Sequence, residues 1–479
     1  MKKRTKIIAT LGPSSTNGNK IEKMLHSGVD VFRINLSHTS IQDVKKIITL
    51  VRDKENKVGR PVAIMLDLQG QKVRIKGFKN KSYINLKSGD KFALNHQLKD
   101  NGNQKQVGIT YKDLYKNVKI GDELLLSDAL IKLRVERIHK QTVHTLVERG
   151  GKLKTYQGLN KKGGGLSLSG ITTKDKSDLR ASLALEYDYI AVSFVKDEKD
   201  IQEIKKIIKN KDIRIIAKIE RNEAIKNIDK ITKVSDGLLV ARGDLGVEIG
   251  IEQLPAAQKF LIRKAISADK IAIVATQMME SMITNRVPTR AEVFDVANAV
   301  TSGVDAIMFS AETAIGKYPA EVISEASRIC VESEQAYIRP LSVDRVVPKT
   351  LPVDQVIALS AVYSAKLTKV VAIAALTETG STALWMSRVQ SNIPIYAMTQ
   401  NKKTGRRICL YKGVQSIYLD KLEVNHAQAN LQVIGLMKEI GTVKKGDLVI
   451  ITKGDLLGTS GGTNAMKVVE VGNMIEINE

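Results

Sequence analysis

Arg214-Ile-Ile-Ala-Lys218 decides the fold, because it is a short apolar, β-branched run that ends in a charged residue. Such a run predicts a buried strand with a polar group at its carboxyl end. The first two thirds of the chain hold eight runs of this kind. The other seven are Lys6-Ile-Ile-Ala-Thr10, Val31-Phe-Arg-Ile-Asn35, Ala63-Ile-Met-Leu-Asp67, Ile190-Ala-Val-Ser193, Gly237-Leu-Leu-Val-Ala-Arg242, Ile271-Ala-Ile-Val-Ala-Thr276 and Asp305-Ala-Ile-Met-Phe-Ser310.

The spacing of these runs predicts how they assemble. Their last polar residues lie 25, 32, 126, 25, 24, 34 and 34 residues apart. All gaps but one fit a strand followed by a helix, and amphipathic stretches such as 200–209 and 258–267 lie between the runs. Eight such units predict a parallel (β/α)8 TIM barrel, whose active site forms at the carboxyl ends of the strands. The long gap predicts a domain inserted after the third strand.

Three domains are therefore expected in this chain of 479 residues. The catalytic barrel would comprise residues 1–70 and 171–345. Residues 71–170 would form a small β-rich domain, because their apolar segments are short and alternate with polar residues. Residues 346–479 would form a C-terminal α/β domain, in which helices alternate with runs such as Val370-Val-Ala-Ile-Ala-Ala-Leu376.

The chain is strongly basic, with a formal net charge of +24. Such a charge attracts phosphate backbones, but aromatic residues make up only 4% and Lys is interleaved with Asp and Glu, which favours a Lys-rich surface over nucleic-acid binding. Residues 71–170 hold 21 Lys and Arg against 8 Asp and Glu, a net charge of +13. Two interpretations fit this segment, a basic lid that attracts a polyphosphate and a soluble module of ordinary Lys-rich composition.

Targeting and redox features are few. The apolar run near the amino terminus is too short for a signal peptide, and no run approaches membrane-spanning length, so we expect a cytoplasmic protein without a membrane partner. Cys330 and Cys409 lie far apart and outside any metal-binding spacing. We expect two reduced thiols in the core.

Two adjacent strand ends carry paired polar residues, namely Lys218 with Glu220 and Arg242 with Asp244. In an extended segment, residues two apart share one face, so each pair is expected to point into one site. Glu220 and Asp244 are hard oxygen ligands suited to Mg²⁺, and Lys218 adds a mobile positive charge. Each residue alone has an ordinary explanation as a solvated ion pair, but together at barrel-strand ends they indicate phosphoryl transfer.

The turn after the first strand of the C-terminal domain is rich in hydroxyl groups. Its residues are Thr377, Glu378, Thr379, Gly380, Ser381 and Thr382. Hydroxyl and backbone N–H groups at a strand-to-helix turn can bind a phosphate, although turns of this composition are also common without a ligand.

Six segments in order along the chain resemble the motifs of the pyruvate kinase family. They are Ile7-Ile-Ala-Thr-Leu-Gly-Pro13, Phe32-Arg-Ile-Asn-Leu-Ser-His38, Ala217-Lys-Ile-Glu220, Ala241-Arg-Gly-Asp-Leu-Gly246, Ala275-Thr-Gln-Met-Met-Glu-Ser281 and Ser310-Ala-Glu-Thr313. The resemblance covers almost the whole chain. It implies a phosphotransferase that moves a phosphoryl group from phosphoenolpyruvate to ADP, giving pyruvate and ATP in the last step of glycolysis.

The resemblance also implies roles for single residues. Arg33 would grip the phosphoryl group and Lys218 would stabilise it during transfer. Glu220 and Asp244 would hold Mg²⁺ or Mn²⁺. The amides of Gly243 and Asp244 would bind the substrate carboxylate, and Thr276 would lie where the enolate is protonated. Residues facing the nucleotide phosphates would be Asn35, His38 and Arg74.

Regulation and assembly follow from the same resemblance. The turn from Thr377 to Thr382 is similar to the loop that binds a phosphorylated activator in this family. The family also suggests a homotetramer.

Departures from the family pattern concern cations. K⁺-dependent members read Asp-Thr-Lys-Gly-Pro-Glu after the third strand, whereas this chain reads Asp67-Leu-Gln-Gly-Gln-Lys72. A monovalent-cation site would be formed by Asn35, Ser37, Asp67 and the carbonyl of Leu68, but the ammonium of Lys72 could replace the ion. We therefore predict weak dependence on K⁺.

A second departure lies in the inserted domain. Gln157-Gly-Leu-Asn160 stands where the family reads Lys-Gly-Val-Asn, so one nucleotide-binding lysine is missing. Lys161 and Lys162 are the candidates to replace it.

Two other functions compete with this interpretation. Another Mg²⁺-dependent barrel enzyme that binds phosphoenolpyruvate, such as a carbon–carbon lyase, could use the same pair of carboxylates, but it would not need Arg74 or a basic lid. A basic nucleic-acid-binding protein with a degenerate barrel would have lost Lys218, Glu220 or Asp244, and all three are present.

Overall fold

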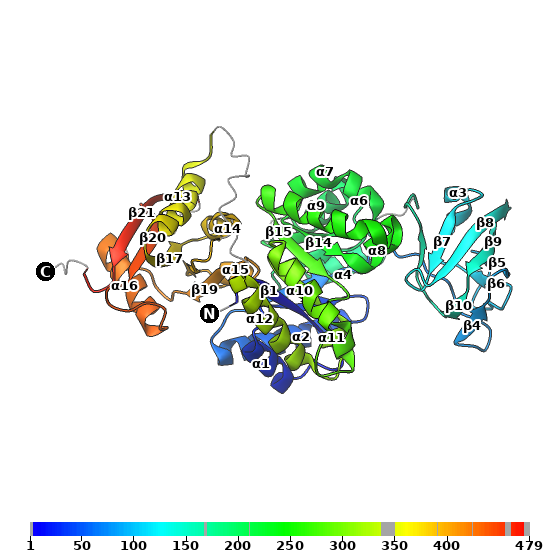
Figure 1. The fold of residues 1–479 in the computed structure, drawn as a ribbon, viewed down its shortest axis with the longest axis horizontal. Coiled ribbons are helices and arrows are strands. Elements are labelled where there is room, and N and C mark those ends of the chain that lie inside the picture. Colours follow the sequence, from blue (N-terminus) through cyan, green and yellow to red (C-terminus); the bar gives the residue numbers. More distant parts are fainter. Residues whose placement is uncertain are drawn as a thin grey trace.

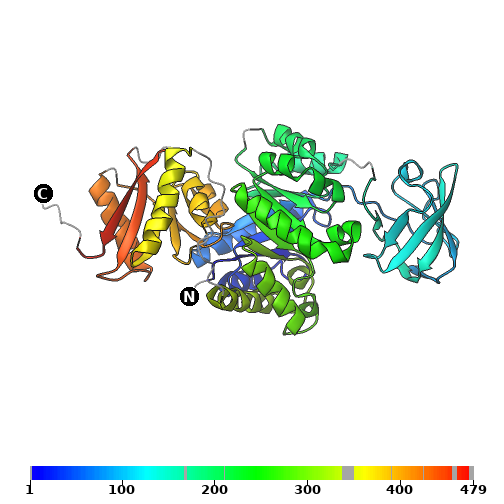
Figure 2. The ribbon, with the colours of Figure 1, turned by 45° about the horizontal axis from the view of Figure 1, so that its top comes forward.

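The computed structural model describes residues 3–166, 170–209, 211–336, 350–389, 391–423, 425–455 and 461–473. Three units lie in a row, with a barrel in the middle, a β-rich unit at one end and an α/β unit at the other (Figures 1 and 2). The sequence boundary expected at 345/346 falls within residues 337–349, outside the described residues.

The central unit is a closed barrel in which every neighbouring pair of strands is parallel. Its eight strands coincide with the eight apolar runs, to within one residue at either end. They are β1 (Lys6–Leu11), β2 (Val31–Asn35), β3 (Ala63–Asp67), β12 (Tyr189–Val192), β13 (Arg214–Ile219), β14 (Gly237–Ala241), β15 (Ile271–Ala275) and β16 (Ala306–Phe309). The predicted TIM barrel is confirmed.

Helices surround the barrel, and several begin at residues that cap the free N–H groups of the first turn. Thr172 and Thr289 form capping boxes with Asp175 and Glu292. The helices are α1 (Gly18–Ser27), α2 (Ile41–Val58), α4 (Thr173–Ser182), α5 (Glu198–Ile208), α6 (Asn222–Lys226), α7 (Ile228–Val234), α8 (Arg242–Ile249), α9 (Leu254–Ser267), α10 (Arg290–Thr301), α11 (Ala311–Ala314) and α12 (Pro319–Ala336), with short 3-10 turns at Ile251–Gln253 and Glu280–Ile283.

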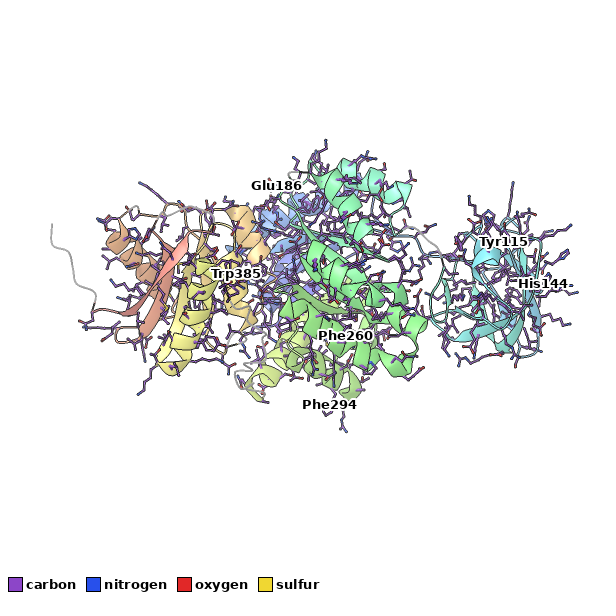
Figure 3. All side chains as sticks on the ribbon, turned by 90° about the horizontal axis from the view of Figure 1, so that it is seen from above. Tyr115, His144, Glu186, Phe260, Phe294 and Trp385 are labelled. Atoms are coloured by element: carbon purple, nitrogen blue, oxygen red, sulfur yellow. The ribbon has the colours of Figure 1, made fainter. Side chains whose placement is uncertain are left out.

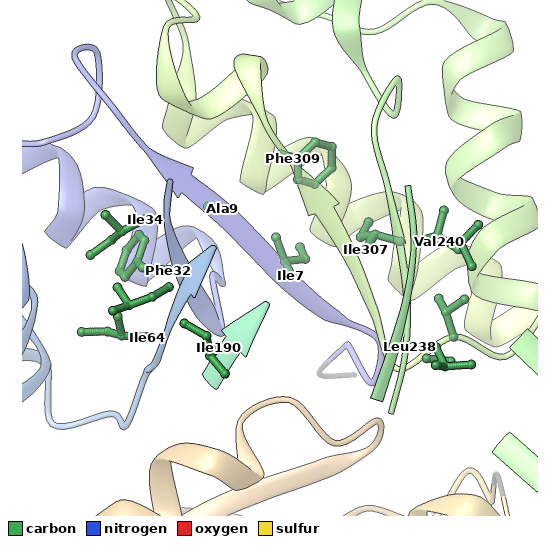
Figure 4. Packing of buried hydrophobic residues seen from close by; sticks show 14 of the residues in the cluster. Ile7, Ala9, Phe32, Ile34, Ile64, Ile190, Leu238, Val240, Ile307 and Phe309 are labelled. Carbon is green, nitrogen blue, oxygen red and sulfur yellow. The ribbon is translucent and has the colours of Figure 1, made fainter. Parts of the chain in front are cut away.

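Side chains alternate between the two faces of each barrel strand, so the buried apolar residues form two separate clusters. Outward residues such as Ile7, Phe32 and Ile64 pack against the helices, as Figure 4 shows. Inward residues such as Ile8 and Met65 belong to a second cluster that fills the barrel and continues into the C-terminal unit. Because the alternation has a period of two, the inward residue at the carboxyl end of a strand is fixed by the strand's register. This geometry brings polar strand ends together at the barrel mouth.

The insert between β3 and α4 is β-rich, as expected. Its largest sheet has six strands in the order β11-β7-β8-β9-β5-β6, and β10 pairs with β4 in a second sheet. A separate apolar cluster fills it. Its elements are β4 (Tyr83–Leu86), β5 (Lys91–Asn95), β6 (Gln106–Gly108), α3 (Leu114–Asn117), β7 (Glu123–Leu126), β8 (Ile131–His139), β9 (Thr142–Arg149), β10 (Gly151–Lys154) and β11 (Leu159–Lys161).

The C-terminal unit is the expected α/β fold. Its sheet has the order β19-β18-β17-β20-β21, and only the edge strand β21 runs antiparallel to its neighbour. The sequence predicted three of these strands and missed both edges, β19 and β21. The elements are α13 (Val353–Leu367), β17 (Val370–Leu376), α14 (Ser381–Arg388), β18 (Ile395–Thr399), α15 (Lys402–Ile408), β19 (Val414–Tyr418), α16 (His426–Glu439), β20 (Leu448–Gly454) and β21 (Thr463–Glu470).

The fold also bears on the expectations about the two cysteines and about membrane-spanning segments. Cys330 and Cys409 are both buried and unpaired, as predicted. Within the described ranges, no helix combines the length and the apolar character needed to cross a membrane.

Candidate active site

Three polar strand ends form a buried ion-pair network at the barrel mouth. Nε of Arg33 on β2 lies 2.6 Å from Oδ2 of Asp67, which ends β3. Nζ of Lys218 on β13 lies 3.3 Å from Oδ1 of the same carboxylate. The carboxylate of Asp67 therefore holds the two cations side by side.

Charge sets the protonation of this network. Burial alone would raise the pKa of Asp67, but the charges of Lys218 and Arg33 outweigh it and keep that pKa below its usual value. Burial would lower the pKa of Lys218, yet the carboxylates of Asp67 and Glu220 raise it. The site therefore keeps a permanently charged ammonium at its centre.

Ser193 is a contributor to which the sequence assigned no role beyond ending a strand. Its Oγ lies directly after β12, accepts a hydrogen bond from Nζ of Lys218 at 2.7 Å and donates to the carbonyl of Leu68 at 2.7 Å. The hydroxyl thus restrains the Lys218 side chain, which the sequence had suggested to be mobile and which is only 8% exposed. Its position at a strand end was the signal that could have identified it.

Glu220 follows β13 and lies beside Lys218, with 3.2 Å between Oε1 and Nζ. The expectation that these residues share a face is confirmed. Oε2 of Glu220 also accepts the N–H of Phe194 at 2.7 Å. Burial and the neighbouring charge of Asp244 raise the pKa of Glu220, against the opposing charge of Lys218.

The Glu220 and Asp244 pair fits a divalent metal. Burial is the main cause of the raised pKa of Glu220 and the charge of Asp244 adds to it, so a divalent cation bound by both carboxylates would relieve this cost. Mg²⁺ commonly uses one or two protein carboxylates and completes its shell with water and substrate oxygens. Among the described residues, no group of three or more His, Cys, Asp or Glu is arranged to hold a metal ion.

The expectation for Arg242 and Asp244 needs correction. These residues do not lie in an extended segment, because α8 begins at Arg242 and residues two apart on a helix face different ways. The guanidinium of Arg242 binds Asp295 at 2.7 Å and the carbonyl of Thr276 at 2.6 Å. Both Arg242 and Asp244 still line the same cleft. Strand-to-helix turns of this kind cannot be recognised from an i, i+2 pattern alone.

Thr276 lies just past β15 in an uncommon conformation. Its φ is +70°, and Gln277 follows with +53°, a region that costs an L-residue about 1–2 kcal/mol. The hydroxyl of Thr276 donates to the carbonyl of Ala275 at 2.6 Å and accepts the N–H of Gly243 at 2.9 Å. The turn thereby directs this hydroxyl towards the first turn of α8.

A cleft of about 300 Å³ opens beside these groups. It is lined by barrel residues together with Lys72 and Asp128, which belong to the inserted segment. The cleft therefore lies where the insert meets the barrel, and its lining includes Gly243, Asp244, Thr276, Ser310 and Glu312.

Lys72 reaches the metal-binding pair from the insert. Its Nζ lies 2.5 Å from Oδ1 of Asp244 and 6.0 Å from the centre of the Phe194 ring. The sequence placed this ammonium at a monovalent-cation site instead. The structure adds a contact with a proposed divalent-metal ligand.

The residues expected to bind nucleotide phosphates and K⁺ lie in three places, namely the end of β2, the end of β3 and the insert. Asn35 ends β2, and its Oδ1 accepts the N–H of Ser37 at 3.0 Å, while the N–H of His38 donates to the carbonyl of Asn35 at 3.2 Å. Arg74 lies in the insert, where its guanidinium donates to the carbonyl of Tyr156 at 3.1 Å. Asn35, Ser37 and His38 thus form one turn next to Asp67, which pairs with Asn35 in the barrel register.

The two lysines that could replace the missing one have partners in the insert. Nζ of Lys161 lies 2.8 Å from Asp122, and Nζ of Lys162 lies 3.2 Å from Glu123. Either ammonium would have to leave a carboxylate to reach a nucleotide.

The hydroxyl-rich turn of the C-terminal unit lines a separate small cavity of about 50 Å³. Gly380 has a φ of +84° and precedes α14, so the turn leads directly into a helix amino terminus. The hydroxyls of Thr379 and Ser381 lie 2.9 Å apart, and Oγ1 of Thr382 bonds Thr463 at 3.0 Å.

Comparison with known proteins identifies the family. Residues 2–323 match the family described as pyruvate kinase, barrel domain, and residues 355–469 match pyruvate kinase, alpha/beta domain. The pyruvate kinase of Buchnera aphidicola subsp. Acyrthosiphon pisum is 44% identical over 98% of this chain and 99% of its own length. Pyruvate kinase II of Salmonella typhimurium is 43% identical over the same shares.

The fold agrees with the sequence relatives. The crystal structure of a pyruvate kinase from Cryptosporidium parvum matches with a TM-score of 0.92 and 33% identity, covering 98% of this chain and 96% of that one. Such coverage favours a phosphotransferase over the lyase and nucleic-acid-binding alternatives. Since both family domains and these full-length relatives match, the chain belongs to the pyruvate kinase family.

Proposed function

We propose that the protein transfers the phosphoryl group of phosphoenolpyruvate to ADP, giving pyruvate and ATP as the last step of glycolysis in the cytoplasm. The observation that carries this proposal is the placement of Lys218, a buried ammonium held by Asp67 at 3.3 Å, Glu220 at 3.2 Å and Ser193 at 2.7 Å. Fixed cations stabilise charge on a transferring phosphoryl group without reorganising during the reaction.

Arg33 and Lys218 would bind the phosphoryl oxygens together. Their shared contact with Asp67 fixes both side chains, so neither has to lose much conformational freedom when substrate binds. A buried Arg is also permanently charged and can donate several hydrogen bonds in one plane.

The carboxylate of phosphoenolpyruvate would bind the N–H groups of Gly243 and Asp244. These amides lie in the first turn of α8, where backbone N–H groups have no partner within the helix and the helix dipole favours an anion. Thr276, whose hydroxyl accepts the N–H of Gly243 in this structure, would release that N–H to the substrate carboxylate and would lie where the enolate is protonated to give pyruvate.

Members of this family depend on a divalent metal, and we assign it to Glu220 and Asp244 as Mg²⁺ or Mn²⁺. Bound there, the ion would supply positive charge next to the oxygens of phosphoenolpyruvate. Lys72 would have to yield at least part of its contact with Asp244 when the ion binds.

ADP would lie between the turn with Asn35 and His38 and the basic insert with Arg74. The insert, residues 71–170, would act as a lid, and the barrel would comprise residues 1–70 and 171–345, followed by the C-terminal domain at 346–479. A net charge of +13 on the insert supports this role, because it attracts a polyphosphate towards the barrel mouth.

K⁺ would be only weakly required. The proposed K⁺ site is formed by Asn35, Ser37, Asp67 and Leu68. Within it, the carboxylate of Asp67 already has two cationic partners, Arg33 and Lys218. The carbonyl of Leu68 accepts a hydrogen bond from Ser193. These contacts leave little negative potential for a further monovalent ion.

A phosphorylated effector would bind the turn of Thr377, Glu378, Thr379, Gly380, Ser381 and Thr382. The cavity that these residues help to line and the start of α14 support this assignment. The proposal names the chemical class of the effector, a phosphate ester, and no individual compound.

A homotetramer is supported by apolar side chains on two surfaces. Phe260 on α9 and Phe294 on α10 are 41% and 76% exposed, and Figure 3 labels them on the barrel. Val353 and Leu367 on α13 are 64% and 87% exposed on the C-terminal unit. Exposed apolar residues of this size are typical of subunit interfaces. Light scattering after size-exclusion chromatography tests the proposal, and a monomer at micromolar concentration would contradict it.

The proposed function is tested by a coupled assay of ADP-dependent pyruvate formation. We expect turnover by the wild-type protein and a loss in kcat of about a thousandfold or more in Lys218→Met, since the charge at the centre of transfer is removed. The matched control is Lys46→Met, because Lys46 lies on α2 and its ion pair with Asp43 is exposed. Retained turnover in Lys218→Met would count against the mechanism.

A further inference from the structure

The segment of residues 163–166, here named the hinge segment, leads from the end of β11 back towards the barrel. Gly163, Gly164 and Gly165 have φ angles of +82°, +77° and +91°. Three consecutive residues in this region favour glycine, since a side chain at each of them would be strained. The chain therefore follows a path here that glycine adopts with less strain than other residues.

The hinge segment is fastened to the barrel by hydrogen bonds on both sides. The N–H of Gly163 donates to the carbonyl of Glu248 at 2.8 Å, and the side chain of Asn222 donates to the carbonyl of Gly163 at 2.9 Å. The N–H of Gly165 donates to Oε1 of Glu223 at 2.7 Å. The position of the insert thus depends on contacts made by α8 and by the start of α6.

The proposed metal-binding carboxylates lie in or next to these two elements, with Asp244 in α8 and Glu220 just before α6. Asn222 and Glu223 follow Glu220 within three residues, and Glu248 lies one helical turn after Asp244 in α8. The backbone N–H of Asn222 also donates to Oε2 of Glu248 at 3.0 Å, which ties the two elements together. The hinge segment is therefore attached to parts of the barrel that lie next to Glu220 and Asp244 in the chain.

We propose that Glu223 is a positioning residue, whose carboxylate holds the hinge segment on the barrel and sets the orientation of the lid over the nucleotide. This inference rests on the proposed function, because it assigns the lid to ADP. Glu223 would not touch a substrate; it would act through the backbone of Gly165.

The carboxylate of Glu223 is suited to this role. A charged acceptor forms a stronger hydrogen bond to a backbone N–H than a neutral one does. Arg221 lies 3.3 Å from the same oxygen and donates to the carbonyl of Leu166 at 2.6 Å, so it joins the carboxylate to the far end of the hinge segment. A Cβ added at Gly164 would lie 2.9 Å from the other oxygen of Glu223. Backbone and carboxylate are therefore in close contact.

The test compares Glu223→Ala with Glu223→Gln in the intact enzyme. In Glu223→Ala we expect the KM for ADP to rise about threefold to tenfold, as loss of one charge-assisted hydrogen bond produces, with the KM for phosphoenolpyruvate nearly unchanged. Glu223→Gln is expected to restore the KM for ADP to within about twofold of wild type, since an amide oxygen accepts the same N–H. Glu136→Ala, which changes an exposed carboxylate on β8, is the matched control.

A second measurement reports lid position directly. Spin labels on Cys introduced at Lys91 in the lid and Lys23 on α1, both exposed, give the distance distribution between lid and barrel. We expect this distribution to broaden in Glu223→Ala and to remain narrow in Glu223→Gln and Glu136→Ala. Gly164→Ala is expected to match Glu223→Ala, and it replaces that variant if Glu223→Ala does not fold.

Three results would overturn the inference. An unchanged KM for ADP with an unchanged distance distribution in Glu223→Ala means that the contact does not set the lid. An equal loss of kcat in the Ala and Gln variants means that the negative charge of Glu223 acts in phosphoryl transfer itself. A rise in the KM for phosphoenolpyruvate as large as that for ADP means a general disturbance of the barrel. Failure of the proposed function is distinct, since the wild-type protein would then form no pyruvate.

Discussion

Nζ of Lys72 lies 2.5 Å from Oδ1 of Asp244, although the two residues are 172 positions apart in the chain. A lysine at the start of the insert thus meets a carboxylate at the start of α8. The contact joins the lid to the proposed divalent-metal site.

The first prediction concerns monovalent cations. With K⁺ replaced by tetramethylammonium, we expect kcat of the wild-type enzyme to stay within about twofold, because the ammonium of Lys72 supplies the local positive charge. Lys72→Glu should make the enzyme depend on K⁺. Steady-state rates measured over a K⁺ titration check both statements.

The matched control for this prediction is Lys76→Glu, since Lys76 lies nearby in the insert and its Nζ binds the carbonyl of His96 at 3.0 Å. The steady-state rate of this variant should not depend on the K⁺ concentration. A steep loss of wild-type rate in the bulky cation would show that Lys72 does not replace the ion.

Removal of a proposed metal ligand should weaken metal binding, and this effect can be measured independently of turnover. For Asp244→Asn we expect the Kd for Mn²⁺ without substrate to rise about tenfold or more, because one of the two anionic ligands becomes neutral. Electron paramagnetic resonance of free Mn²⁺ provides the measurement. Asp229→Asn, at a carboxylate that is 72% exposed on α7, should leave the Kd unchanged. Equal affinity in the two variants would remove Asp244 from the metal site.

The effector turn can be tested by adding a negative charge. Ser381→Asp should fold normally, since Asp is favourable at a helix amino terminus, but its carboxylate would repel a phosphate. We expect basal turnover to persist while activation by a panel of sugar and nucleoside phosphates is lost. Asn425→Asp adds the same charge at the start of α16 and should keep the activation. Activation that survives in Ser381→Asp would place the effector elsewhere.

Glu248 gives a prediction about pH. Burial raises the pKa of this carboxyl from 4.5 to about 7, so between these values the folded state keeps a proton that the unfolded state releases. Its stabilising contribution is present below pH 4.5 and is lost as the pH rises to about 7. Glu248→Gln should therefore raise the free energy of unfolding by about 3 kcal/mol at pH 8 and by less than about 1 kcal/mol at pH 5.

Chemical denaturation at the two pH values checks this expectation, and Glu136→Gln, at an exposed carboxylate, is the control that should show no difference. An equal effect of Glu248→Gln at both pH values would mean that the carboxyl does not titrate in this range.

Most of the barrel could be predicted from the sequence because its evidence is local. A buried strand such as β3 shows as an apolar run, and the alternation of Met65 inward and Leu66 outward then fixes the inward direction of Asp67. The same reasoning placed Lys218 and Glu220 on one face, which is confirmed at 3.2 Å. The edge strands β19 and β21 were missed, since their exposed faces weaken the apolar pattern.

The sequence by itself determined the number of barrel strands, the polar residue at the end of each and the family. The strands could be recognised because alternation and strand length are local properties, and the family could be recognised from its six motifs. Tertiary structure decided the rest: that a helix starts at Arg242, that Ser193 restrains Lys218, that Lys72 meets Asp244 and that Glu223 holds the hinge segment. Each contact forms only when the closed barrel brings separate elements together, so local sequence patterns cannot predict it.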